Sequence, residues 1–199
     1  MSIEIIPLSA AHVPGVATLH MRYLRSPFQG EPGQRMLEAY YRALITQKGG
    51  CGYVALVGTR LAGYVCGVWN SSAVKKTLII DQWSCLLGAA IQSSWQSPML
   101  WVDLLSRLPV IRKTNNRPPI EGYELRPIVV DEGFRGTGVA PSLISKLTSD
   151  ARNRGYTFIF LATERDNIPA NKFYQKQGFE SMGTVMKPRQ EYIYYTKHL

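Results

Sequence analysis

The sequence predicts a mixed α/β fold built in layers, and two observations support this prediction. Short apolar runs of strand length alternate with longer segments of helical periodicity along the 199 residues. Read in order, they give β-α-α-β-β, a helical insert and then β-α-β-α-β-β, which is typical of a layered α/β fold. Hydrophobic residues make up 45% of the chain, enough for a buried core. We expect one domain over residues 1–199, with the insert at about 71–117.

The first part of the chain is expected to form two helices and three strands. Ser9 is a candidate N-cap for the first helix, and apolar residues then recur at helical spacing up to Leu24. Residues 26–33 are rich in glycine and proline and are interpreted as a loop. The expected elements are a strand at 3–6, a helix after Ser9, a second helix at 34–47, and strands at 51–57 and 61–69 joined by the turn 58–60.

The second part alternates strands and helices. Asn167 is a candidate N-cap and Pro169 lies in the first helical turn behind it, while Gly155 is expected just after a helix end. The insert has helical periodicity and contains Trp83, Trp95 and Trp101. The expected elements are a strand at 121–130, a helix at 138–154, a strand at 156–162, a helix at 168–177 and a closing hairpin of 179–186 and 190–197.

Charge and cysteine content exclude several classes of protein. The net charge is +9 and the pI about 9.6, which favours anionic partners. The basic residues are scattered and not interleaved with aromatic ones, so we expect no nucleic-acid partner. Three cysteines without zinc-pair spacing predict no metal site and suit a reducing cytoplasm. The chain starts without a secretory leader, and polar residues interrupt 78–108, so we expect a cytoplasmic protein with no integral membrane segment.

The turn at 135–140 is the strongest candidate for a binding site. It reads Arg-Gly-Thr-Gly-Val-Ala and leads from a strand into a helix. A helix N-terminus offers free backbone N–H groups and a positive dipole end, so anions bind there. Glycines let the backbone approach a phosphate, and Arg135 adds a charge-assisted contact. Neither a P-loop nor a dinucleotide fingerprint fits, because Gly138 is followed by Val139-Ala140 and the third small residue of the fingerprint is replaced by Pro141.

Two motifs in the same order carry a family resemblance. The strand at 123–130 followed by Arg135-x-x-Gly138-x-Ala140 resembles motif A of the GNAT superfamily of acyl-CoA N-acyltransferases. Residues 167–179 resemble its motif B, Asn-x-x-Ala-x-x-Phe-Tyr-x-x-x-Gly-Phe. The match is tight over 123–179, compatible in topology over 3–69, and does not cover the insert. The resemblance implies a mostly antiparallel mixed sheet with helices on both faces and a helical insert between the third and fourth strands.

The resemblance also implies acetyl-CoA as cosubstrate. In the family, the pyrophosphate lies on the turn, and the pantetheine arm pairs with the motif A strand like an added strand. Pro127 cannot donate to a ladder, so it predicts a bulge where this strand parts from its neighbour. Asn167 is a candidate contact of the pantetheine amide. The implied cofactor-binding residues are Ile128, Val129, Val130, Arg135, Gly136, Thr137, Gly138, Val139, Ala140, Asn167 and Tyr174.

Catalytic residues are carried over from the same motifs. Tyr174 holds the position of the family's general acid, which protonates the departing thiolate. Glu124 has the spacing of the glutamate base of histone-type members, and we expect it to share a strand face with Arg126, Ile128 and Val130. Glu164 is a second candidate base. His12, His20 and His198 are interpreted as packing or surface residues before any catalytic role.

The expected function is transfer of an acetyl group to a primary amine of a small molecule by direct attack in a ternary complex. Phe28 and Gln29 in the first loop, Tyr23, and Tyr192 and Tyr194 in the last strand are the candidate acceptor-binding residues. The insert suggests an amino-sugar acceptor by analogy with other bacterial proteins of the family, or a homodimer interface. The alternatives are a non-catalytic acyl-CoA-binding module and an acetyltransferase acting on a protein amine.

Overall fold

The computed structural model describes residues 2–24, 30–46, 49–69, 122–187 and 190–199. The predicted insert and the loop residues Phe28 and Gln29 lie outside these ranges. In the described parts, no helix is both long enough and apolar enough to cross a membrane.

A seven-stranded sheet organises the described residues, in the order β1-β2-β3-β4-β5-β7-β6. All neighbouring strands are antiparallel except β4 and β5, which run parallel. The prediction of a mixed, mostly antiparallel sheet is therefore confirmed. The strands are β1 Ile3–Pro7, β2 Gly50–Val57, β3 Arg60–Val68, β4 Tyr123–Val130, β5 Phe158–Glu164, β6 Glu180–Lys187 and β7 Gln190–His198.

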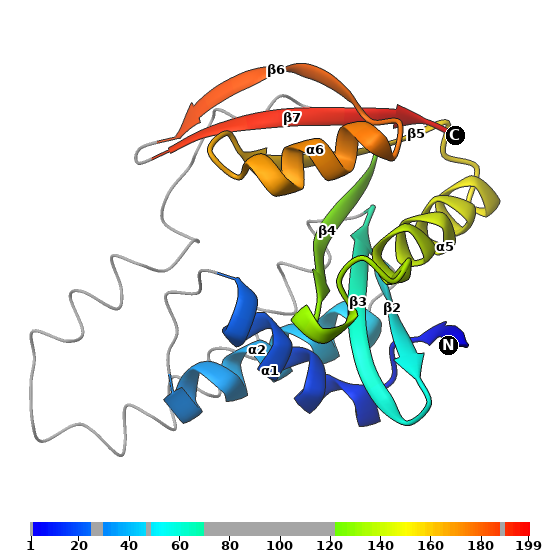
Figure 1. Cartoon of the computed structure of the whole chain (residues 1–199), viewed down its shortest axis with the longest axis vertical. Helices are drawn as coiled ribbons and strands as arrows, with labels where there is room; N and C mark the ends of the chain where they lie inside the picture. Colours follow the sequence, from blue (N-terminus) through cyan, green and yellow to red (C-terminus); the bar gives the residue numbers. More distant parts are fainter. Residues whose placement is uncertain (1, 25–29, 47–48, 70–121, 188–189) are drawn as a thin grey trace, which may run out of the picture.

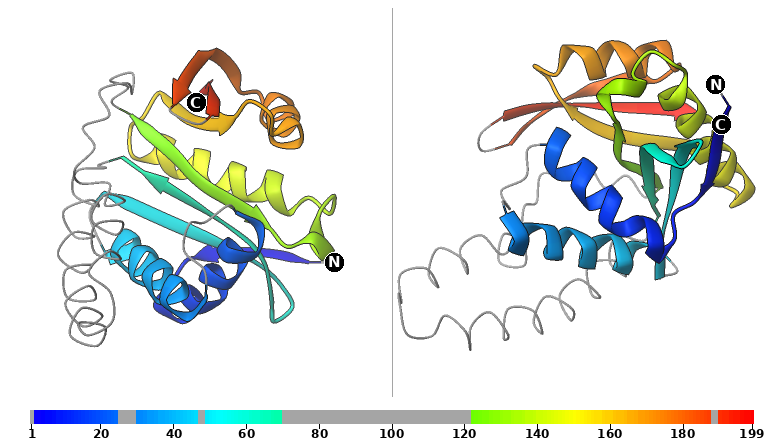
Figure 2. Two further views of the ribbon diagram at one scale, coloured as in Figure 1. Left: turned by 90° about the vertical axis from the view of Figure 1, so that its left-hand side faces the viewer. Right: turned by 60° about the horizontal axis from the view of Figure 1, so that its bottom comes forward.

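Helices cover both faces of the sheet, as expected (Figures 1 and 2). The helices α1 Val13–Tyr23 and α2 Gly30–Thr46 pack on one face through a core that includes Val16, Tyr41 and Tyr64. The helices α5 Val139–Asn153 and α6 Ile168–Lys176 pack on the other face through a second core. Two short 3-10 helices, η1 Ala10–His12 and η2 Glu132–Phe134, lead into α1 and follow β4.

Two predicted boundaries are wrong by a few residues. The helix α2 begins at Gly30, not at residue 34, because a proline is tolerated in a first turn and Glu31 suits the positive end of the helix dipole. The strand β5 spans 158–164, not 156–162. Gly155, at φ +81°, closes α5 as predicted, but the N–H of Tyr156 still donates to the carbonyl of Ala151. The chain therefore becomes extended two residues later.

The predicted bulge at Pro127 is present in β4. Val65 pairs with Ile128 and Gly67 pairs with Leu125, so one residue of β3 faces two residues of β4. The two residues of β4 at this bulge are Arg126 and Pro127, and the proline has no N–H to donate to β3. The bulge allows β4 to bend away at this point.

The bulge also reverses the alternation of side chains along β4. Leu125, before it, and Ile128, after it, both pack in the core under α5, whereas Val129 packs in the core under α1 and α2. The expectation that Glu124, Arg126, Ile128 and Val130 share one face is therefore wrong. Glu124 and Arg126 face the α2 side, where their charges act on Tyr40.

The strands β4 and β5 stay together for two residue pairs over their described length. Tyr123 pairs with Ile159 and Glu124 pairs with Phe160, and beyond them the strands separate. Figure 1 shows β5, β6, β7 and α6 forming one side of the resulting opening and β4 the other. The backbone edges of β4 from Leu125 and of β5 from Leu161 lack a strand partner across this opening.

Candidate active site

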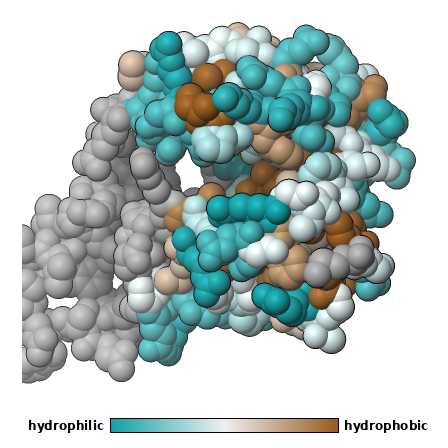
Figure 3. Space-filling view, in the orientation of Figure 1, coloured by the Kyte–Doolittle hydropathy of each residue, from teal (hydrophilic) through white to brown (hydrophobic). Residues whose placement is uncertain are grey.

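A cavity of about 630 Å³ fills the opening between β4 and β5. Figure 3 shows it as a hollow between two polar rims with apolar residues at its floor. Its walls come from the end of α1, from β4 and β5, from the start of α6 and from β7. The lining residues are Tyr23, Leu24, Glu124, Leu125, Arg126, Pro127, Ile128, Leu161, Ala162, Thr163, Glu164, Asp166, Asn167, Pro169, Ala170, Tyr174 and Tyr192.

The predicted anion turn leads into α5 at the end of β4. Gly136 has φ +78° and Gly138 has φ +93°, a backbone conformation that side chains other than glycine rarely adopt. Open space surrounds Gly136, where an added Cβ would meet no atom within 4 Å. Among the described residues, the N–H groups of both glycines donate to no acceptor. With the unpaired N–H groups of the first α5 turn, they form a set of donors suited to a phosphate.

The end of α1 fixes this turn through Tyr23. The Tyr23 hydroxyl accepts from the N–H of Glu132 (3.1 Å) and donates to Oδ2 of Asp131 (3.3 Å). The guanidinium of Arg135 lies 4.9 Å from the Tyr23 ring centre, and its Nε donates to the carbonyl of Val130 (3.5 Å). Tyr23 therefore orients the cationic side chain that the sequence assigns to the phosphate.

Two asparagines hold the start of α6. Oδ1 of Asn167 accepts from the N–H of Ala170 (3.3 Å), which confirms the predicted N-cap. Nδ2 of the buried Asn171 donates to three backbone carbonyls of the β5–α6 connection, and its Oδ1 accepts from the Tyr195 hydroxyl (3.0 Å). The sequence analysis did not identify Asn171. A polar residue on the buried side of a short helix was the signal that could have indicated it.

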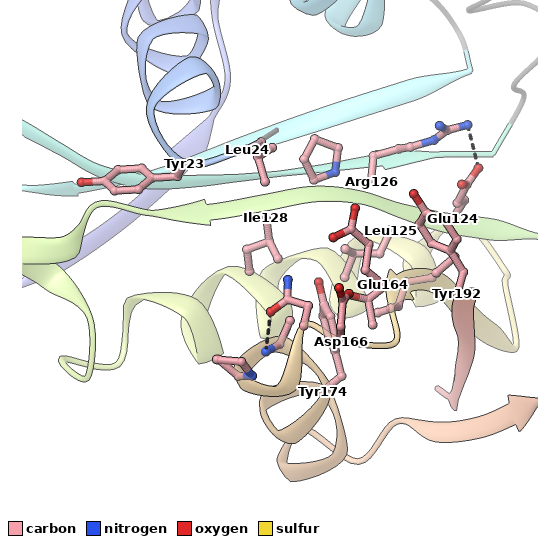
Figure 4. A pocket seen from close by; sticks show the side chains of 17 residues that line it. Tyr23, Leu24, Glu124, Leu125, Arg126, Ile128, Glu164, Asp166, Tyr174 and Tyr192 are labelled. Carbon is pink, nitrogen blue, oxygen red and sulfur yellow. Dashed lines mark hydrogen bonds and ion pairs between the residues drawn. The ribbon is translucent and has the colours of Figure 1, made fainter. Parts of the chain in front are cut away.

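Tyr174 lines the cavity from α6. It is 8% exposed and packs edge-on against Phe179. Figure 4 shows its hydroxyl pointing into the opening. Burial raises the pKa of this phenol, so the hydroxyl keeps its proton at neutral pH. The group can donate a proton to an atom placed in the opening.

Three carboxylates and one arginine line one end of the cavity. Oε2 of Glu124 accepts from Nη2 of Arg126 (2.8 Å), and both side chains are largely buried. Glu164 projects from the end of β5 toward β4, on the same side of the opening as Tyr174 (Figure 4). Burial and the nearby charges of Glu164 and Asp166 raise the pKa of Tyr192, which lines the same end. This end of the cavity is therefore charged and mainly anionic.

Several candidate residues lie away from the cavity. Tyr194 is buried in β7 and does not line it, unlike Tyr192. His12 bonds to Ser9 before α1, and His20 bonds to the hydroxyls of Tyr41 and Tyr64. His198 is exposed at the end of β7. The structure thus leaves Glu124 and Glu164 as the glutamates that line the cavity.

Comparison with known proteins agrees with this geometry. Residues 110–179 match the model of the acetyltransferase (GNAT) family, and that range contains the anion turn, β5 and the Asn167–Tyr174 segment. The chain carries a GNAT acetyltransferase domain. The chain is 31% identical over 121 residues to the uncharacterized protein ML0378 of Mycobacterium leprae, with 61% of this chain and 29% of that protein covered.

A second relative and two solved structures extend the comparison. The N-acetylaspartate synthetase of Xenopus tropicalis is 28% identical over 174 residues, which cover 82% of this chain and 62% of that protein. The chain therefore spans less than two thirds of either relative. Its GNAT fold matches the ribosomal-protein-S18-alanine N-acetyltransferase of Escherichia coli (TM-score 0.63, 11% identity, 99% and 94% covered). It also matches NAA60 of Arabidopsis thaliana in complex with acetyl-CoA (TM-score 0.63, 13% identity, 100% and 99% covered).

Proposed function

We propose that this protein is an acetyl-CoA-dependent N-acetyltransferase that acts on a primary amine of a small molecule by direct attack in a ternary complex. The separation of β4 from β5 carries the proposal, because it leaves two unpaired strand edges beside a glycine turn. An extended amide chain ending in a pyrophosphate needs such a pair of features. The buried phenol of Tyr174 lies between that chain's binding edge and the charged end of the cavity.

The cofactor end would bind mainly through backbone groups. The N–H groups of Gly136, Thr137, Gly138, Val139 and Ala140 would hold the pyrophosphate, with Arg135 adding charge. The edge of Ile128, Val129 and Val130 would pair with the pantetheine amides, and Asn167 would contact them from the other wall. Acetyl-CoA supplies an activated thioester. The protein therefore has to position the thioester and the amine and to protonate the departing sulfur.

In the reaction, a new N–C bond forms at the acetyl carbon and the C–S bond breaks. A glutamate takes the proton that the amine loses, and Tyr174 gives its proton to the sulfur. Glu124 and Glu164 are the two candidates for the base. The pairing of Glu124 with Arg126 favours Glu164, which points toward the opening beside Tyr174.

The relatives' names span both classes of acceptor. One relative is named for N-acetylaspartate, and one structural neighbour for an alanine of a ribosomal protein. A cavity with four charged side chains at one end favours a small polar acceptor over an extended peptide. The amino-sugar acceptor, the homodimer and the cytoplasmic location stay predictions.

The test measures two quantities on the purified full chain. Calorimetric titration gives the affinity for acetyl-CoA, and a thiol reagent follows CoA release across a panel of amino acids, amino sugars, polyamines and N-terminal peptides. We expect micromolar binding, on the order of −8 kcal/mol, and turnover of at least one small amine. Binding without turnover of any amine would support the acyl-CoA-binding module, and turnover of the peptides alone would support a protein acetyltransferase.

A further inference from the structure

Arg126 has an unusual setting in the proposed acceptor end. The Arg126 side chain is 25% exposed, and its Nη2 donates to the carboxylate of Glu124, whose side chain is 21% exposed. Its Nε is buried and has no hydrogen-bond partner among the residues that the structure describes. A buried donor on a charged group normally finds an acceptor, since leaving it unpaired is costly.

The contact with Glu124 uses only part of the hydrogen-bonding capacity of the Arg126 guanidinium group. A guanidinium presents five N–H donors in a planar fork that matches the two oxygens of a carboxylate. Among the described residues, Glu124 is the sole carboxylate paired with Arg126. The Arg126 side chain also lines the cavity, so the donors that Glu124 does not take are candidate contacts for an acceptor group of a bound ligand.

The opposite wall of the cavity carries negative charge. Glu164 and Asp166 lie at the end of β5, and their charges act on Tyr192 across from them. The cationic side chain on β4 and the carboxylates after β5 line one cavity. A ligand with one anionic and one cationic group a few atoms apart complements both walls at once.

We infer that the acceptor is an amino acid, with Arg126 binding its carboxylate and the carboxylates at the end of β5 attracting its ammonium group. The inference rests on the proposed acetyltransferase function. A polyamine brings no acceptor group to Arg126. The hydroxyl groups of an amino sugar and the amide carbonyl of a peptide can accept a hydrogen bond, but they lack the charge and the paired oxygens with which a carboxylate matches the guanidinium fork. Arg126 is then a specificity-determining residue of the acceptor site.

Matched pairs of acceptors test the inference on the full chain. CoA release is compared for each amino acid and its α-carboxamide, and for glucosamine and glucosamine 6-phosphate. We expect kcat/KM to be about 10- to 100-fold higher for the best acid than for its amide, the worth of one charged hydrogen-bonded pair. Equal rates within the pairs, or a preference for the neutral or phosphorylated sugar, would overturn the inference and leave the acetyltransferase function standing. Absence of release with every amine removes the function itself, and the inference with it.

Variants separate Arg126 from a merely structural role. Arg126→Met should lower the acid-to-amide ratio of kcat/KM toward one, chiefly through KM of the acid. The double variant Arg126→Met/Glu124→Gln removes the pair without leaving Glu124 unpaired, and Arg126→Lys retains charge without the fork. We expect both to lose most of the ratio, with acetyl-CoA affinity and the melting temperature as folding controls. An unchanged acid-to-amide ratio of kcat/KM in the folded double variant would show that Arg126 does not bind the carboxylate of the acceptor.

Discussion

The two ends of the cavity are built in different ways. The proposed cofactor end runs from the cavity at Ile128 to the anion turn and consists of backbone N–H groups and strand edges from two continuous segments, 128–140 and 167–174. The proposed acceptor end is assembled from side chains of separate elements, with Arg126 on β4, Glu164 on β5, Asp166 in the next connection and Tyr192 on β7. Tyr174 lies between the two ends.

The difference explains what each end can specify. Backbone groups at a helix N-terminus bind a phosphate whatever the neighbouring side chains are, so one motif can serve many proteins. Side chains brought together by the fold are free to change one at a time, so the acceptor end can differ between proteins that share the motif. A substitution at the cofactor end should therefore lower the affinity for acetyl-CoA. A substitution at the acceptor end should instead change kcat or KM for the acceptor.

The largest effect is expected at the junction of the two ends. Tyr174→Phe removes the proton donor and keeps the ring, so kcat should fall by about 10²- to 10⁴-fold. The acetyl-CoA affinity should stay within about twofold, because the phenol's packing is retained. Steady-state CoA release and calorimetry measure the two quantities. Tyr156→Phe is the matched control, since Tyr156 packs on Tyr123 outside the cavity; equal losses in both variants would contradict an acid role for Tyr174.

The next effect separates the two glutamates of the acceptor end. Glu164→Gln should lower kcat by about 100-fold if Glu164 is the base, and the loss should be greatest at neutral pH, where the amine is protonated. Glu124→Gln should act mainly on KM of the acceptor, because Arg126 loses its anionic partner. Profiles of kcat against pH for both variants decide between them. The reverse ranking would restore Glu124 as the base.

A smaller effect is expected at the cofactor end. Gly136→Ala forces a side chain into a conformation at φ +78° that costs about 1–2 kcal/mol, so acetyl-CoA affinity should fall by about 10-fold. Gly155→Ala is the control, because Gly155 has φ +81° and equally open surroundings but lies at the far end of α5. Both variants should lose similar thermal stability. If Gly155→Ala weakened acetyl-CoA binding as much, the turn would have no special part in it.

More of the cofactor end than of the acceptor end could be predicted from the sequence. The turn, the Asn167 cap and the bulge at Pro127 could be predicted because each depends on a local backbone property: a positive φ, a free N–H or a missing one. The acceptor end could not, because it depends on which way side chains point after the bulge. Strand alternation placed Glu124 with Ile128, and the single extra residue reversed that face.

Residues with structural roles were also hard to separate from functional ones. His20 was a weak candidate base, and the structure gives it two phenol partners in a core instead. Asn171 carries no motif signature, yet it bonds to three carbonyls that shape the β5–α6 connection. Both roles depend on contacts between elements more than twenty residues apart or on loop carbonyls, which residue spacing does not reveal.

The smallest effect concerns the core between α1, α2 and the sheet. Nδ1 of His20 in α1 lies 2.7 Å from the Tyr41 hydroxyl of α2, which lies 2.7 Å from the Tyr64 hydroxyl of β3. Burial lowers the pKa of His20 below its ordinary value of 6.5. As the pH falls through 6.5, the unfolded chain takes up a proton before the folded chain does, so the free energy of unfolding decreases.

The variant His20→Asn tests this pH dependence because its amide oxygen replaces Nδ1 as an acceptor and does not titrate. Between pH 7.5 and 5, wild type should lose more melting temperature than the variant does, by about 2–4 °C for each kcal/mol of the difference. Calorimetric melts at half-unit pH steps give the two curves. Parallel curves would mean that His20 titrates alike in both states. A fall of acetyl-CoA affinity over the same range in wild type alone would show that this core is coupled through α1 to the anion turn, where Arg135 lies against the Tyr23 ring.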